Sequence, residues 1–130
     1  MTREVDKMMK GFEVTIEEVK ESMESGDSLF FVNVLHHQDH DWAVMKVRGA
    51  LRVPDNEVEK HLDEIPRDRT IVIYSTCPGD ERSIRAAQLL QQHGCSDVHP
   101  LIGGFNAYLD AGLPVEEIGR GNKTLEIMGL

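Results

Sequence analysis

The run LFFVNVL at residues 29–35 is apolar at every position except Asn33, and this constrains the fold more than any other stretch. A strand that is apolar on both faces is typical of a parallel sheet that is covered by helices on both sides. We expect further strands at residues 70–74 and 98–101, and shorter ones at residues 12–14 and 49–53.

Helical stretches separate these strands. Thr15-Ile16-Glu17-Glu18 has the pattern of a capping box and opens a helix that Gly26 closes. Further helices are predicted at residues 55–65, 83–93 and 105–112, and a helical turn at residues 43–48. Strands that alternate with helices of this length predict an α/β domain with a mainly parallel sheet.

The chain has 130 residues, the size of a single domain with its own core, and no internal repeat is visible. Residues 1–11 are interpreted as an N-terminal extension and residues 119–130 as a Gly-containing surface tail. The domain itself is then expected to span residues 12–118.

Composition narrows the function classes. The formal net charge is -9, which disfavours phosphate backbones and therefore a nucleic-acid partner. No apolar run approaches the roughly 20 residues that cross a bilayer, so no membrane association is expected. The start, MTREVDKMMKGF, contains no signal-peptide stretch, and two cysteines do not make a disulfide framework. We therefore predict a cytoplasmic protein; its oligomeric state is not indicated.

The segment IVIYSTCPGDERS at residues 71–83 places Cys77 in a short loop between a predicted strand and a predicted helix. In a parallel α/β sheet, ligands bind where such loops enter helices. Backbone amides and the positive end of the helix dipole lower the pKa of a cysteine at this position. Arg82 and Arg85 add positive charge nearby. The loop is therefore a candidate site for nucleophilic sulfur chemistry.

Three residues of the same loop oppose that chemistry. Asp80 and Glu81 place negative charge beside the thiol, and Pro78 lacks an amide hydrogen that could contribute to an anion cradle. From the loop alone, an inert cysteine buried in a tight turn is an equally good interpretation of Cys77.

Residues 71–115 resemble the C-terminal half of a rhodanese domain. The matching pieces are IVIY, a loop that begins with cysteine and ends RSIRAAQLLQQHG, and DVHPLIGGFNAYLDAGLPVE. The segments VTIEEVKESMESGDSLFFVNV and VRGALRVPDNEVEKHLDEIP are similar to the N-terminal half of the family more loosely. The resemblance covers residues 12–118 and implies a three-layer sandwich whose central sheet is flanked by helices.

The chain departs from the family pattern at several positions. Asn33-Val34-Leu35 stands where the family has Asp-x-Arg, and Lys46 where a histidine is common. The family cysteine follows the aromatic residue of the strand directly, so counting from Tyr74 selects Ser75. Counting back from the helix selects Cys77, with four residues before Arg82. Because the loop and the helix N-terminus form the anion cradle, we favour Cys77.

The resemblance implies a sulfurtransferase or sulfur carrier that forms a persulfide on Cys77 and passes sulfane sulfur to a thiol or another nucleophile. Arg82 is then expected to act on the donor electrostatically. The substrate-binding residues implied with it are Pro78, Gly79, Asp80, Glu81 and Ser83, with His36 and His37 at the rim. The resemblance implies no metal and no other cofactor. The partners are a sulfane-sulfur donor, for which a protein persulfide is one candidate, and a thiol acceptor.

Two alternatives remain at this stage. The domain can instead be catalytically inactive and act as a protein-binding or redox-sensing module, with Ser75 marking lost chemistry. The loop HHQDHDW at residues 36–42 carries metal-ligand side chains, although a solvated loop is the favoured interpretation. Cys95 is expected in the core, Phe105 in packing, and Arg52 on a solvated face.

Overall fold

The computed structural model describes residues 11–36, 45–75 and 81–118. The elements in chain order are α2 (Ile16–Glu24), β1 (Leu29–Leu35), β2 (Met45–Val47), β3 (Leu51–Pro54), the 3-10 helix η1 (Val58–Glu64), β4 (Thr70–Tyr74), α3 (Glu81–Gln92), β5 (Val98–Pro100), α4 (Gly104–Asp110) and β6 (Val115–Glu117). The predicted α/β class is confirmed.

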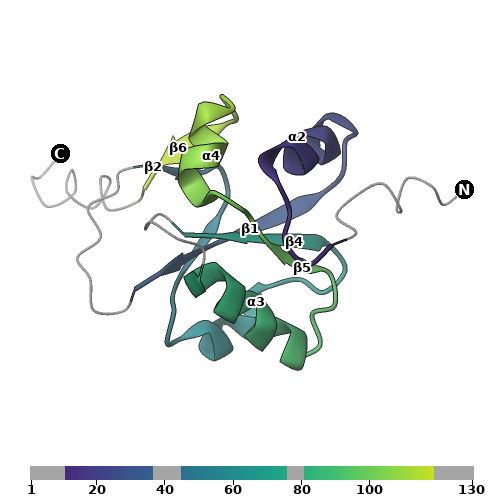
Figure 1. Cartoon of the computed structure of the whole chain (residues 1–130). Coiled ribbons are helices and arrows are strands. Elements are labelled where there is room, and N and C mark those ends of the chain that lie inside the picture. The colour runs from purple at the N-terminus through teal and green to yellow at the C-terminus, as the bar shows by residue number, and fades with distance from the viewer. Residues whose placement is uncertain (1–10, 37–44, 76–80, 119–130) are drawn as a thin grey trace, which may run out of the picture.

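Four strands form a parallel sheet in the order β3-β1-β4-β5, and β2 and β6 form a separate antiparallel pair. Helices α2 and α4 cover one face of the parallel sheet, whereas α3 and η1 cover the other (Figure 1). The predicted three layers are therefore present. Parallel strands place all their carboxyl ends at one edge of the sheet, which is where this topology puts a ligand.

The side chains of β4 show why the central strands must be apolar on both faces. Ile71 and Ile73 pack into the core beneath α3, whereas Val72 and Tyr74 pack into the core beneath α2 and α4. Successive side chains of a strand point to opposite faces, so each core receives every second residue. Cys95 is buried in the α3 core, as predicted.

The capping box of α2 is also confirmed. The backbone N–H of Glu18 donates to Thr15 Oγ1 at 3.2 Å, and the backbone N–H of Thr15 donates to Glu18 Oε1 at 2.8 Å. These two bonds satisfy backbone donors that the first turn of a helix leaves without an intrahelical partner.

Two predicted helical segments are wrong. Within residues 43–48, Met45–Val47 is a strand, because this segment pairs antiparallel with Val115–Glu117 seventy residues later, a partner that local patterning does not reveal. Residues 55–65 contain only the 3-10 helix η1, in which Val58 is the buried residue. Ile65 is extended, as expected for a residue before a proline.

The turn between β5 and α4 holds the end of β4. Gly103 and Gly104 both have positive φ, +87° and +57°. The backbone N–H of Phe105 donates to the carbonyl of Ser75 at 3.2 Å. A Cβ on Gly104 would lie 2.5 Å from that same carbonyl oxygen, so the close approach of the two segments requires glycine.

Tyr74, the last residue of β4, connects this strand to the β2–β6 pair. Its ring stacks on Phe105 with centroids 5.5 Å apart, and its hydroxyl accepts the backbone N–H of Val47 at 3.1 Å. Burial raises the pKa of Tyr74 to about 12, and the hydrogen bond from Val47 opposes this shift.

We predict that Gly104→Ala destabilises the domain by about 2–4 kcal/mol, because it combines left-handed backbone strain with a contact against Ser75. The matched control is Gly26→Ala, which also has positive φ but has no atom within 4 Å of the added methyl. It should cost about 1 kcal/mol. Urea unfolding of both variants measures the difference; equal losses would contradict the proposed close approach.

We also predict a specific loss of stability in alkali. Because the folded pKa of Tyr74 lies above its ordinary value, its contribution is complete below about pH 10 and falls as the pH rises through about 12. Between about pH 9 and about pH 11, wild type should lose roughly 1 kcal/mol that Tyr74→Phe does not lose. The check is urea unfolding of both proteins at these two pH values. Identical losses would rule out Tyr74 as the source.

Candidate functional site

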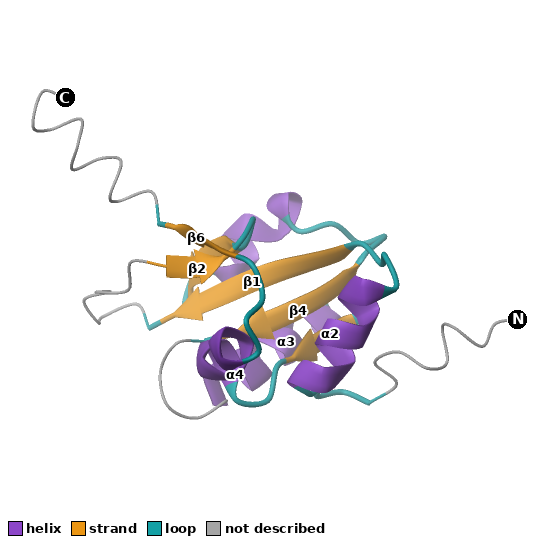
Figure 2. Ribbon diagram, turned by 90° about the horizontal axis from the view of Figure 1, so that it is seen from above, coloured by secondary structure: helices purple, strands orange, loops and turns teal. Residues whose placement is uncertain are grey.

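The carboxyl edge of the parallel sheet brings together residues that are far apart in sequence. His36 follows β1, Asp55 follows β3, Ser75 follows β4, and Leu101 follows β5. Figure 2, a view onto the sheet, shows the arrowheads of β1 and β4 directed toward this same edge. The helix α3 begins beside it at Glu81.

Several predicted site residues lie outside the described part of the chain. They are Cys77, Pro78, Gly79, Asp80 and His37, within residues 37–44 and 76–80. Their assignment stays a prediction. The loop HHQDHDW is outside it too, apart from His36. Within residues 11–36, 45–75 and 81–118, no three side chains gather as metal ligands.

The described site residues come from the first turn of α3 and from the end of β1. Arg82, Glu81 and Ser83 occupy the first turn of α3, and His36 follows β1 in a half-buried position. Ser83 is buried and Glu81 is exposed. Arg82 therefore lies in the first turn of the helix that follows residues 76–80 in the chain.

Arg82 is paired with a carboxylate that the sequence did not reveal as part of the site. Its Nε lies 3.3 Å from Oδ2 of Asp55, and both side chains are about three-quarters buried, with 22% and 23% exposed. The backbone N–H of Asp55 donates to the carbonyl of Leu35 at 2.6 Å, which fixes Asp55 against the end of β1. The signal in the sequence was an acidic residue two positions after the end of the strand predicted at residues 49–53.

The second arginine of this helix is paired as well, but at the surface. Arg85 Nη2 lies 3.1 Å from Oε2 of Glu81, and the two side chains are 71% and 80% exposed. Such an exposed pair on one helix contributes little to stability.

Ser75 belongs to the packed end of β4. It is only 3% exposed, and its carbonyl accepts the N–H of Phe105. The residue that the count from the strand selects is therefore enclosed by the turn that precedes α4.

A polar row crosses the sheet just before its carboxyl edge. Arg52, Asn33 and Tyr74 are register partners on three neighbouring strands. Burial is the largest influence on the pKa of Tyr74 and raises it. Hydrogen bonds from Val47 and Asn33 and the charge of Arg52 lower the same pKa. Arg52 is half-buried, so the expectation of a solvated arginine is wrong. Only the strand register could have revealed this row.

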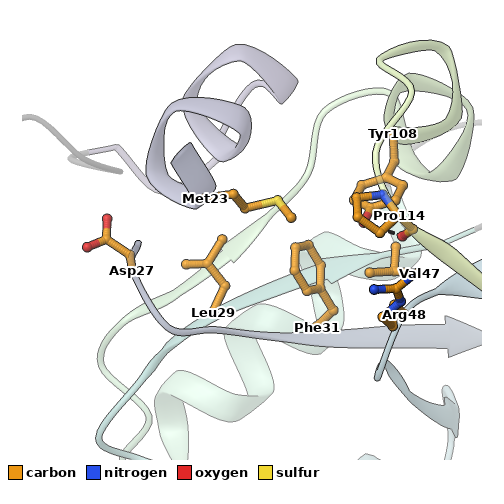
Figure 3. Close-up of a pocket in the computed structure, with 8 residues that line it drawn as sticks. All are labelled: Met23, Asp27, Leu29, Phe31, Val47, Arg48, Tyr108 and Pro114. Carbon is orange, nitrogen blue, oxygen red and sulfur yellow. Dashed lines mark hydrogen bonds between the residues drawn. The ribbon is translucent and has the colours of Figure 1, made fainter. Parts of the chain in front are cut away.

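A separate cavity of about 320 Å³ lies on the α2 and α4 side of the sheet. Figure 3 shows apolar side chains at its centre and the charged residues Asp27 and Arg48 toward its ends. None of the predicted site residues that the structure describes lines it. In the part of the chain that the structure describes, no helix is long and apolar enough to cross a membrane.

Relatives at the level of sequence cover only part of the chain. A sulfurtransferase of Allochromatium vinosum is 38% identical over 69 residues, 53% of this chain and 63% of that protein. The uncharacterized protein YqhL of Bacillus subtilis is 34% identical over 62 residues, 48% of each chain. The aligned segments thus span less than two-thirds of either relative.

Solved structures match more of the chain. A rhodanese-like domain from Anabaena sp. has a TM-score of 0.66 at 25% identity, covering 83% of this chain and 80% of that one. A rhodanese-related protein from Thermoplasma volcanium has a TM-score of 0.63 at 16% identity, covering 82% and 98%. A Rhodopseudomonas palustris protein described as a possible tyrosine phosphatase has a TM-score of 0.62 at 25% identity, covering 80% and 83%.

The family model for the rhodanese-like domain matches residues 15–111. This range includes every described strand of the parallel sheet and the helices that cover its two faces. This range also contains the Cys77 loop, Asp55 and Arg82. With the parallel sheet and the similar solved structures, it shows that the chain belongs to the rhodanese-like domain family.

Proposed function

We propose that the chain is a sulfurtransferase or sulfur carrier that forms a persulfide on Cys77. The Cys77 thiolate attacks the outer sulfur of a donor, and a new S–S bond forms. The bond between that sulfur and the donor breaks, and the leaving group departs with its electron pair. A thiolate acceptor then attacks the outer sulfur and regenerates the Cys77 thiolate.

The observation that carries the proposal is the position of α3 at the carboxyl edge, with Arg82 in its first turn. Counting back from Arg82 in this helix, with four residues between, selects Cys77. The N-terminal amides of the helix favour an anion. Buried Ser75 is poorly placed to meet a donor from solvent. Cys95 lies in the core, which leaves Cys77 as the candidate nucleophile.

The name of one relative and the size of the loop support sulfur transfer over phosphatase chemistry. The A. vinosum relative carries the name sulfurtransferase. For phosphatase chemistry, as in the description of the R. palustris structure, a wider loop is needed, because phosphate is larger than a sulfane sulfur. The net charge of -9 also disfavours phosphorylated partners and nucleic acids. We place the protein in the cytoplasm, where free thiols persist.

Incubation with a sulfane-sulfur donor should add one sulfur atom to Cys77, and intact-protein and peptide mass spectrometry measure this addition. Cys77→Ser should abolish it, because serine does not form a persulfide. Ser75→Ala is the matched control two residues away and should retain most of the labelling.

Two outcomes would contradict the proposal. Labelling that survives in Cys77→Ser would assign the chemistry to another residue. Absence of labelling with every donor would instead support an inactive domain that binds a protein or senses redox state. A circular dichroism spectrum equal to wild type shows that each variant is folded.

A further inference from the structure

The charge at the start of α3 differs from what the sequence suggests. Arg82 and Arg85 are the two cations of its first turns, and the structure pairs each with a carboxylate, Asp55 and Glu81. The helix therefore presents two neutralised arginines, rather than two net positive charges, to a donor that approaches this edge.

The two pairs are not equivalent. The Arg85–Glu81 pair is exposed, so water and salt screen it and either side chain can turn to another partner. The Arg82–Asp55 pair is about three-quarters buried, where the attraction between charges is stronger. A donor that needs Arg82 must compete with Asp55 for it.

Asp55 is also held in place by the backbone. Its N–H bond to Leu35 joins the segment after β3 to the end of β1, and the carboxylate reaches across to α3. It contacts Arg82 through Nε. The pair thus links two strand ends to the helix that follows the Cys77 loop.

We infer that Asp55 is a specificity-determining residue, which neutralises Arg82 and selects against donors with two negative charges. This inference rests on the proposed sulfur transfer. With thiosulfate, the thiolate takes the outer sulfur and sulfite leaves with the electron pair of the broken bond. That donor and its leaving group are both dianions. A hydropersulfide, R–S–SH, carries at most one negative charge and releases a thiolate, so it depends less on a free cation.

The test compares two donors, thiosulfate and the hydropersulfide of N-acetylcysteinamide, with a thiol acceptor in excess. Wild type should prefer the hydropersulfide. Asp55→Asn keeps the size of the side chain and removes its charge, which leaves Arg82 unneutralised. We expect kcat/KM for thiosulfate to rise about fivefold or more, mainly through KM, and kcat/KM for the hydropersulfide to change less than about twofold.

The matched control is Glu59→Gln. Glu59 pairs with His93 at 2.8 Å and links η1 to the end of the same helix, away from the carboxyl edge. Glu59→Gln removes one negative charge, as Asp55→Asn does, so any effect of net charge alone appears in both variants. We expect no change in donor preference for Glu59→Gln.

Arg82→Gln determines whether Asp55 acts through Arg82. In the Arg82→Gln background, Asp55→Asn should no longer improve the use of thiosulfate, whereas independent effects would add. Asp55→Glu, which retains the charge, should retain the preference of wild type. Thermal unfolding of each variant separates a change in specificity from a loss of fold.

The outcomes distinguish this inference from the proposed function. If no donor forms a persulfide on Cys77 in wild type, the proposed function fails. If the hydropersulfide works but Asp55→Asn leaves thiosulfate use unchanged, sulfur transfer stands and the role of Asp55 is overturned. A gain of similar size in Glu59→Gln would also overturn it, because it would show a general charge effect.

Discussion

The parallel pairing of β1 with both β3 and β4 is the constraint on which the rest of the structure depends. It sets Asn33 beside Arg52 and Tyr74, and it brings the chain after each strand to one edge. Asp55 can reach Arg82 only because β3 and β4 both pair with β1 and therefore end at the same edge. A shift of one residue in register would turn every side chain of a strand to the other face and so exchange residues between the two cores.

A second tie holds the edge together from the α4 side. The Gly103-Gly104 turn approaches the carbonyl of Ser75 so closely that a side chain at Gly104 would meet it. Phe105, the next residue, donates its N–H to that carbonyl and stacks on Tyr74. The end of β4 is therefore held by α4 as well as by β1.

The elements that the sequence predicted well are those whose signals are local. The apolar run at Leu29–Leu35 and the capping box at Thr15 depend on side-chain type and spacing within one segment, and both are confirmed. The strand Met45–Val47 has no such signal, because its partner β6 lies about seventy residues away. The helix predicted at residues 55–65 is instead the 3-10 helix η1, in which only Val58 is buried.

The same limit applies to the candidate site. The spacing between Cys77 and Arg82 is visible in the chain and Arg82 lies in the first turn of α3, but the roles of both residues stay predictions. Asp55 was not predictable as its partner, since the two residues are 27 positions apart and meet only through the sheet. The half-buried position of Arg52 escaped prediction for the same reason.

The pairing changes how the charges of the site should be interpreted. In the sequence, Arg82 and Arg85 add positive charge near the Cys77 loop, and Asp80 and Glu81 add negative charge. In the structure, Asp55 adds a further carboxylate on Arg82, so the described part of this edge has as many negative as positive side chains in these two pairs. Backbone amides at the start of α3 also attract an anion, and their effect falls off within the first turn. Amides of that kind can stabilise a single thiolate or persulfide charge locally, but they provide no mobile cation for a dianion. Under the proposed sulfur transfer, the pairing of Arg82 and Arg85 with carboxylates therefore favours a donor of low charge.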